Sequence, residues 1–204
     1  MATIAQDNFD RADGPVGANW IQASGTGVVT GSEYGGGTFN VDNACFWTAS
    51  VWPSNHWSQV SLGSVTGDSG PVVRCKDIPQ QYYEVYFSST WHIGVVSTGG
   101  TFDTASTDSG KNTGDTLLLE CSGGVGDVHF KLYRNSNLIL NCVDTTAGGL
   151  TGGSPGVYIF TNGGVRLDNW IGGDFTSASA AISSSYFTIT GIQSITGIQS
   201  IKFS

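Results

Sequence analysis

Short runs of alternating hydrophobic and polar residues fill most of the chain, and clusters of glycine, asparagine, aspartate and serine separate them. A period of two is typical of strands with one face in a core and one face in water. No stretch keeps a helical period for longer than two turns. The predicted strands are 39–41, 44–49, 58–62, 70–76, 82–88, 91–97, 116–122, 128–134, 137–143, 156–160 and 165–171. The pattern predicts an all-β, antiparallel fold.

One of these boundaries predicts a hairpin. Residues 134–137, Arg-Asn-Ser-Asn, separate two alternating runs, 128–132 and 138–142. A short polar turn between two such runs joins neighbouring antiparallel strands. About a dozen half-buried strands of this kind favour a two-sheet β-sandwich of the jelly-roll type.

Two segments with similar chemistry enclose the strands. The first is Asp7-x-Phe9-x-Arg11-x-Asp13-Gly14-x-x-Gly17-x-x-Trp20, and the second is Gly153-Ser154-Pro155-Gly156-Val157 followed by 165–175. Together with 81–87, 114–120 and 128–135, they resemble concanavalin A-like lectin/glucanase domains, nearest to the laminin-G-like modules of bacterial surface proteins and phage particles. The resemblance covers roughly residues 5–175 and implies a jelly-roll sandwich with Trp20 and Trp170 in its core. It assigns no single function, because this fold carries enzymes, lectins and structural modules.

The charge balance removes some partners. The net charge is −8 and the chain has only eight lysines and arginines, without a basic cluster. A phosphate backbone or an anionic membrane needs a basic surface, so we expect neither nucleic acid nor membrane as a partner. Neutral polymers such as glycans are compatible with this charge.

The start of the chain and its cysteines bear on where the protein works. Residues 1–6 lack the basic start and apolar run of a signal peptide, and no segment is apolar enough to span a bilayer. We therefore expect either a leader that has been removed or assembly in a cytoplasm, before display on an extracellular particle (a virion) or a cell surface. Cys45, Cys75, Cys121 and Cys142 form no CxxC pair, which disfavours zinc. Free core thiols and disulfides both stay open.

The carboxylates give little support to catalysis. Glucanases of this fold carry two glutamates and an aspartate alternating on one strand, whereas Glu33, Glu84 and Glu120 here each lack a carboxylate two residues away. The residue types that a polysaccharide lyase needs are present, but their spacing has no signature. We expect a protein that is not an enzyme, with a secreted glycoside hydrolase or lyase as the alternative.

Glycan binding needs aromatic platforms and polar side chains on one face. Alternation places Trp57 with Gln59, and Tyr82 with Glu84 and Tyr86, while Arg74 lies opposite its apolar neighbours. If these strands are neighbours, the six residues line one shallow groove and form a candidate carbohydrate-binding site. The alternative is that these aromatic side chains pack beneath loops.

The resemblance also implies a candidate metal site. Many members of this fold hold calcium where the first and last strands meet, and Asp7 and Asp168 here supply hard oxygen ligands. The alternative for Asp168 is that it caps a turn with Asn169.

The last part of the chain differs in kind. Residues 176–181 read as a linker, and 190–195 are repeated as 196–201. Isoleucine recurs at every third position: Ile189, Ile192, Ile195, Ile198 and Ile201. Period three sends successive isoleucines to opposite faces of a strand, so both faces require burial. We predict a sandwich over 1–175 and a linker with an oligomerisation or docking arm over 176–204, with contacts to other subunits or particle proteins through 182–204. A strand folded back on the sandwich and a disordered tail are the alternatives.

These expectations combine into one hypothesis. We expect a non-catalytic, lectin-like structural protein of a particle or cell surface, of the phage decoration, capsid-surface or tail type. Glycan binding and assembly through the C-terminal arm are its expected properties.

Overall fold

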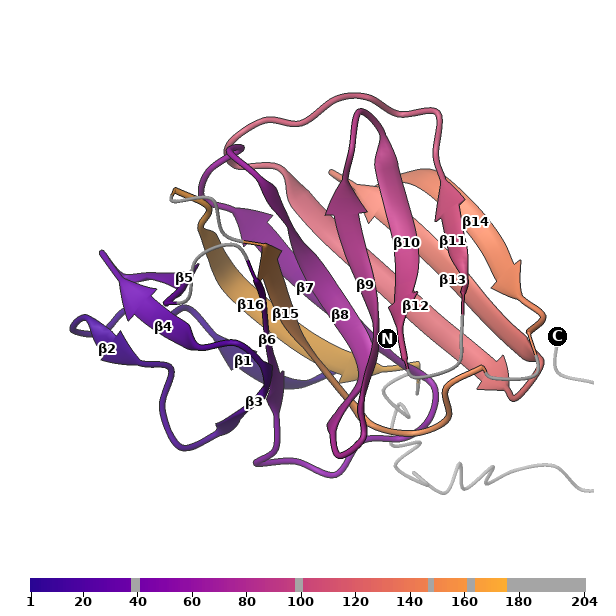
Figure 1. The fold of residues 1–204 in the computed structure, drawn as a ribbon, viewed down its shortest axis with the longest axis horizontal. Coiled ribbons are helices and arrows are strands. Elements are labelled where there is room, and N and C mark those ends of the chain that lie inside the picture. The colour runs from indigo at the N-terminus through magenta and orange to yellow at the C-terminus, as the bar shows by residue number, and fades with distance from the viewer. Residues whose placement is uncertain (38–40, 98–100, 147–148, 161–163, 176–204) are drawn as a thin grey trace, which may run out of the picture.

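Two stacked antiparallel sheets make up the protein, as a computed structural model shows (Figure 1). The structure describes residues 1–37, 41–97, 101–146, 149–160 and 164–175. Within these ranges there is no helix, and therefore none long and apolar enough to cross a membrane. Every strand pairing described is antiparallel, which confirms the predicted fold class.

The larger sheet, sheet A, has the strand order β14-β13-β12-β7-β16-β5-β4-β2, with β1 paired to β16. Its strands are β1 (Ala2–Asp7), β2 (Gly14–Pro15), β4 (Gly27–Thr30), β5 (Glu33–Gly36), β7 (His56–Leu62), β12 (Thr116–Gly124), β13 (Asp127–Arg134), β14 (Asn137–Asp144) and β16 (Leu167–Asp174). The first and last strands described are thus neighbours at the same place in sheet A. The two segments that enclose the predicted strands meet there.

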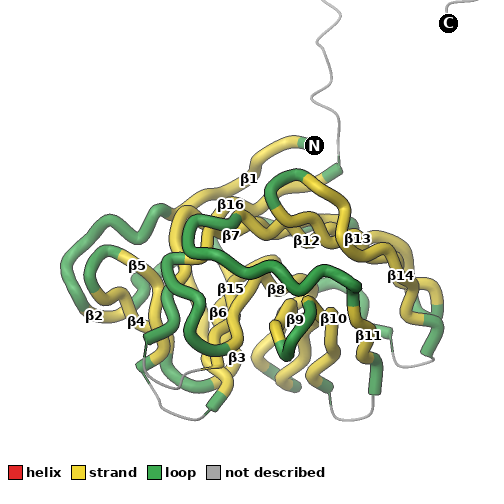
Figure 2. The backbone as a smooth tube through the Cα atoms, turned by 90° about the horizontal axis from the view of Figure 1, so that it is seen from above, coloured by secondary structure: helices red, strands yellow, loops and turns green. Residues whose placement is uncertain are grey.

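The smaller sheet, sheet B, has the order β11-β10-β9-β8-β15-β6-β3. Its strands are β3 (Trp20–Ser24), β6 (Asp42–Trp47), β8 (Asp68–Asp77), β9 (Gln80–Phe87), β10 (Trp91–Val96), β11 (Asp103–Ala105) and β15 (Ser154–Phe160). Seen from above, the two sheets form two layers (Figure 2). Sheet B is curled: its edge strand β3 contacts β8 and β9, although β6 and β15 separate them in the strand order. The Ser24 hydroxyl of β3 lies 3.5 Å from the Tyr82 hydroxyl of β9.

The main core lies between the sheets and includes an aromatic cluster formed by both enclosing segments. The ring centroids of Trp20 and Trp170 are 4.8 Å apart, and Trp47 stacks on Trp170 at 5.4 Å. Trp170 is fully buried and Trp20 is 6% exposed. Both are therefore core anchors, as predicted, and their burial stabilises the join between the first and last strands.

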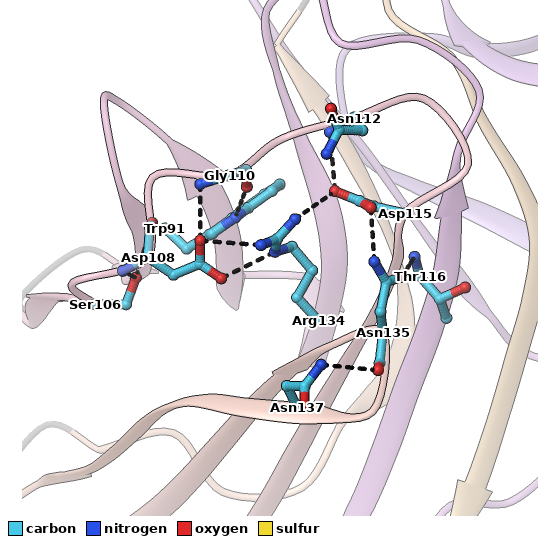
Figure 3. Close-up of polar contacts among 10 residues, drawn as sticks. All are labelled: Trp91, Ser106, Asp108, Gly110, Asn112, Asp115, Thr116, Arg134, Asn135 and Asn137. Carbon is cyan, nitrogen blue, oxygen red and sulfur yellow. Dashed lines mark hydrogen bonds and ion pairs between the residues drawn. The ribbon is translucent and has the colours of Figure 1, made fainter.

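A polar network fixes the loop between β11 and β12 to the β13–β14 hairpin (Figure 3). The guanidinium of Arg134 donates to both oxygens of Asp108, at 2.9 and 3.2 Å, and to Asp115 Oδ2 at 3.0 Å. Asp115 also accepts hydrogen bonds from Asn112 and Asn135. Because Asn135 and Ser136 have positive φ, the hairpin turns tightly here. The hairpin predicted at residues 134–137 is confirmed, and its arginine is a structural ion-pair partner.

The predicted strands from 44–49 onward are found with shifted ends, whereas the predicted strand 39–41 lies mostly outside the described residues. The first forty residues also contain strands that alternation did not predict. β1 to β5 are short and rich in glycine or polar residues, so their pattern is weak. The four cysteines are free thiols: Cys45, Cys75 and Cys121 are buried and Cys142 is partly buried. Burial raises the pKa of Cys45 and of Cys121 to about 12, so both stay protonated and unreactive.

A candidate glycan site on the outer face of sheet B

The outer face of sheet B carries a shallow hollow of about 340 Å³, which we call the sheet-B hollow. Eight residues line it, and six of them carry its chemistry: Asp68, Glu84, Tyr86, Gly94, Asp103 and Tyr158. Alternation along β9 places Glu84 and Tyr86 on this face. Tyr83 and Val85 belong to the main core, whereas Tyr82 and Tyr86 pack in a second cluster on the opposite face. Tyr82, Glu84 and Tyr86 thus share a face, but Tyr82 is fully buried and does not line the hollow.

Glu84 lies at the centre of this surface. It pairs with Val72 on β8 and with Gly94 on β10, and Gly94 in turn pairs with Asp103 on β11. A side chain at Gly94 would begin 3.1 Å from the Tyr86 ring, so glycine at this position keeps the hollow open. The strand register therefore brings one glutamate and one aspartate to either side of a gap.

The carboxyl group of Glu84 differs from the other buried carboxyl groups that the structure describes. Its Oε2 atom is buried and has no hydrogen-bond partner among the described residues. Burial raises the pKa of Glu84 to about 8, and the negative charges of Asp42, Asp68 and Asp103 add to this rise. The group is therefore mostly a neutral acid at pH 7, with a polar atom that a ligand can satisfy.

Tyr86 and Asp103 form one wall of the hollow, and His92 contacts both of them. The Tyr86 hydroxyl donates to Asp103 Oδ2 at 2.7 Å, and His92 Nδ1 lies 3.1 Å from Asp103 Oδ1. The rings of Tyr86 and His92 stack with centroids 4.7 Å apart. Burial and the bond to Asp103 raise the pKa of Tyr86, so its hydroxyl stays protonated. This wall offers a fixed aromatic surface with a carboxylate at its edge.

The opposite wall comes from β15, β6 and β8. Tyr158 donates from its hydroxyl to Asp42 Oδ1 at 3.3 Å. Phe160 pairs with Asp42 on one side and with Asp68 on the other, so both aspartates stand in one row of the sheet. Burial raises the pKa of Asp68, an effect that the nearby ammonium of Lys111 partly offsets. The hollow thus joins aromatic rings to acceptor-rich carboxylates, a pattern suited to a hydroxylated ligand.

The other proposed groove residues lie elsewhere, so the expected single groove does not exist. Trp57 and Gln59 are on β7, which belongs to sheet A, and they face away from the core on that side. Trp57 is only 6% exposed: its ring covers Gly173, and its Nε1 donates to Asp174 O at 3.0 Å. Gln59 lines a separate shallow pocket together with Tyr133. A role for either in sugar binding stays a prediction that concerns sheet A.

Arg74 is buried inside the sandwich rather than displayed in the sheet-B hollow. The β8–β9 register shifts between Val73 and Lys76, and Arg74 has a φ of 54°, so its side chain does not follow simple alternation. Its guanidinium donates to the carbonyls of Leu150 and Gly123, the latter at 2.6 Å. Arg74 is fully buried and holds loops together, so it has no access to a ligand in this structure.

The two aspartates proposed for calcium are engaged with protein groups. Both oxygens of Asp7 accept hydrogen bonds from Arg11, and Trp20 Nε1 donates to Asp7 Oδ2 at 2.8 Å. Asp168 accepts from both the backbone and the side-chain nitrogen of Asn169. Within the described ranges no three acidic, histidine or cysteine side chains are grouped for a metal. The residues as placed do not fit calcium unless Arg11 moves away, and its binding stays a prediction.

The predicted oligomerisation residues lie outside the described residues. They are Ile189, Ile192, Ile195, Ile198 and Ile201, within the predicted segment 176–204. The last described strand, β16, ends at Asp174, next to the predicted end of the sandwich.

Sequence reasoning missed the acidic partners of Glu84. Asp42, Asp68 and Asp103 lie at the ends of β6, β8 and β11, far apart in the chain. Each is an aspartate at a strand boundary, where aspartate usually marks a turn. The only signal in the sequence was the face of its strand to which alternation assigns each aspartate. That assignment brings the aspartates together only when the order of strands in sheet B is known.

The sheet order and the two-layer packing give the chain the concanavalin A-like jelly-roll fold. No protein-family model matches the chain, and no curated protein matches it. Among solved structures, it is similar to the carbohydrate binding module CBM66 from Bacillus subtilis, with a TM-score of 0.55 and 14% identity over 74% of this chain and 91% of that one. The likeness establishes the fold alone.

Two weaker likenesses involve proteins whose names indicate enzymes. The GH43 BlXynB protein from Bacillus licheniformis is 15% identical, with a TM-score of 0.49 over 84% of this chain and 39% of that chain. The alginate lyase Aly36B is 10% identical, with a TM-score of 0.43 over 73% of this chain and 83% of that one. The fold by itself does not decide between a binding module and an enzyme.

Proposed function

We propose that this protein is a non-catalytic glycan-binding module and that the sheet-B hollow is its binding site. One observation carries the proposal: Glu84, whose buried Oε2 has no partner among the described residues, lines an open hollow together with Tyr86 and Tyr158. A buried polar atom without a partner destabilises the fold, and a ligand hydroxyl or amine that bonds it removes that penalty. The likeness to a carbohydrate-binding module is compatible with this role.

The setting on a particle or cell surface, with assembly through residues 182–204, is part of the same proposal. It rests on the sequence, in particular on the isoleucine repeat and the acidic charge balance. The two parts are independent, because the hollow lies in the sandwich and the repeat lies beyond it.

The binding experiment compares the two faces of the sandwich. Wild type and the Tyr86→Ala variant are tested on a glycan array, and each glycan bound is then titrated by calorimetry. Tyr133→Ala is the matched control, because Tyr133 lies on the outer face of sheet A beside Gln59. We expect Tyr86→Ala to weaken binding by roughly tenfold or more, which is the loss of one aromatic platform and one hydroxyl, and Tyr133→Ala to leave it unchanged.

The outcomes separate the alternatives. Loss with Tyr133→Ala instead would move the site to sheet A, where Gln59 and Trp57 lie. A wild type that binds no glycan on the array would remove the binding function altogether. Both variants are checked for an unchanged unfolding midpoint, so that loss of binding is not loss of fold.

An enzyme is the second candidate, and the raised pKa of Glu84 favours it. A carboxyl group that is protonated at neutral pH is the kind of group that serves as a general acid. New reducing ends, or the ultraviolet absorbance of a new double bond, after incubation with a polysaccharide would establish turnover. If Glu84→Gln abolished that turnover, the non-catalytic proposal would be wrong.

A further inference from the structure

The sheet-B hollow has many hydrogen-bond acceptors, and the tyrosine hydroxyls that line it are already engaged. The tyrosine hydroxyls that line it already donate to aspartates: Tyr86 to Asp103 at 2.7 Å and Tyr158 to Asp42 at 3.3 Å. His92 is likewise in contact with Asp103. Oε2 of Glu84 remains without a donor. Apart from the O–H of Glu84 in its neutral form, this surface offers acceptors, so a ligand that brings donors fits it best.

The same surface carries an excess of negative charge. The titratable groups that face Glu84 come from six strands: Asp42 on β6, Asp68 on β8, Tyr82 and Tyr86 on β9, His92 on β10, Asp103 on β11, and Tyr158 on β15. Three further carboxyl groups therefore lie near enough to Glu84 to raise its pKa. Even with Glu84 protonated, Asp42, Asp68 and Asp103 make the hollow attractive to a cation and repellent to an anion.

The nearest cation described does not neutralise the hollow. Lys111 directs its ammonium to the carbonyl of Gly67 and lies over the rings of Phe87 and Trp91, at 5.1 and 5.8 Å from their centroids. Its effect on this surface is a partial lowering of the pKa of Asp68. The centre of the hollow, around Glu84, has no lysine or arginine among the residues that line it.

We infer that the sheet-B hollow selects glycans with a free amino group, such as glucosamine or galactosamine units, over their N-acetylated and acidic counterparts. The inference rests on the proposed function and names its ligand class. An ammonium group brings up to three donors and a positive charge to a surface that offers carboxylates. An N-acetyl group brings one donor and one acceptor but no charge. A uronate adds a further negative charge to a surface that is already negative.

Binding of an ammonium group also changes the protonation of the hollow. Glu84 is mostly protonated in the free protein at neutral pH, since its pKa is about 8. A cation beside it favours the carboxylate, so Glu84 releases its proton when an ammonium binds. The proton goes to the solvent or, if the amine arrives uncharged, to the amine itself. Calorimetry in two buffers of different ionisation enthalpy measures the release.

The test uses matched oligosaccharides of glucosamine and of galactosamine, each fully deacetylated and fully N-acetylated, together with a uronate oligosaccharide. The full-length protein is titrated with each at pH 7. We expect the deacetylated form to bind roughly ten- to a hundredfold more tightly than the acetylated form, as a charge-assisted hydrogen bond implies. The uronate is expected to bind most weakly.

Two variants locate the effect. Glu84→Gln keeps the shape of the side chain and removes its charge, so the preference for the amine should fall several-fold. Glu120→Gln is the matched control, because Glu120 faces outward from sheet A, and it should keep the preference. A preference that persists in Glu84→Gln would show that general attraction to an acidic protein causes it, and would overturn the inference.

The remaining outcomes distinguish the inference from the function beneath it. Equal binding of both forms, or tighter binding of the acetylated form, would overturn the amino-group selectivity and leave glycan binding in place. Absence of binding to any sugar on the array would overturn both.

Discussion

The substitution Glu84→Gln is predicted to stabilise the folded protein, by an amount that grows with pH. Burial and three neighbouring aspartates raise the pKa of Glu84 from 4.5 to about 8. Below pH 4.5 the carboxyl group is protonated in both the folded and the unfolded protein, so its raised folded-state pKa costs no stability. As the pH rises toward 8, folding stability is lost, because the unfolded chain releases this proton at a lower pH than the folded protein does. Glutamine carries no charge at any pH and avoids this loss.

The magnitude follows from the distance between the two pKa values. The folded-state value lies about 3.5 pH units above the reference, and each pH unit corresponds to about 1.4 kcal/mol. The glutamine variant should therefore gain almost nothing at pH 4, about 3 kcal/mol at pH 7, and up to roughly 5 kcal/mol above pH 8. A gain of this size is a large part of the stability of an ordinary domain.

Urea unfolding followed by tryptophan fluorescence, at intervals from pH 4 to pH 9, measures the effect. The difference in unfolding free energy between variant and wild type should rise with pH and level off near pH 8. Asp127→Asn is the control, because Asp127 is 70% exposed in a surface pair with His129 and should change the free energy by less than about 1 kcal/mol. A difference that stays flat across this range, or that falls with pH, would refute the assignment of Glu84 as a buried acid.

Three further predictions concern other parts of the chain. Arg134→Met should lower the free energy of unfolding by roughly 2–3 kcal/mol at pH 7, because three charge-assisted hydrogen bonds to Asp108 and Asp115 are lost. Burial acts to raise the pKa of Asp115, but its hydrogen bonds with Asn135, Asn112 and Arg134 hold that pKa below the usual value. The loss of stability in Arg134→Met should therefore shrink as the pH falls below about 4, and a loss that does not change with pH would contradict this reasoning. Arg74→Met should lower the melting temperature and reduce the free energy of unfolding by roughly 2–4 kcal/mol, because it leaves buried carbonyl groups without a hydrogen-bond donor. An unchanged stability would argue against the structural role of Arg74. Deletion of 177–204 should reduce the molecular mass measured by light scattering to that of a monomer, and an unchanged oligomer would exclude the tail as the assembly element.

The part of the site that could be predicted from sequence is the part within one strand. A period of two is enough to place Tyr82, Glu84 and Tyr86 on one face. Tyr83 and Val85, which alternate with them, face the core by the same rule. Alternation also predicted the hairpin at 134–137, because the turn and both strands are adjacent in sequence. These features depend on local geometry alone.

The part that could not be predicted depends on long-range pairing or on a local irregularity. β7 lies in sheet A, between β12 and β16, so Trp57 and Gln59 are separated from β9 by the whole core. Arg74 sits in an irregular stretch of β8, and one such shift is enough to send a side chain to the other face. Neither the strand order nor the register shift has a signature in the residues concerned.

The contrast between Glu84 and the other buried carboxyl groups argues that the hollow is a site and not a packing accident. Buried Asp144 accepts a hydrogen bond from Tyr83 at 2.7 Å, and Asp115 is held by Arg134 and Asn135. In the described residues Glu84 contributes the one buried carboxylate oxygen without a partner. Folding alone would favour glutamine or an apolar residue there, since either avoids repulsion from three aspartates. A carboxyl group that weakens the fold, at the centre of an open aromatic hollow, is best explained by a ligand that supplies its missing partner.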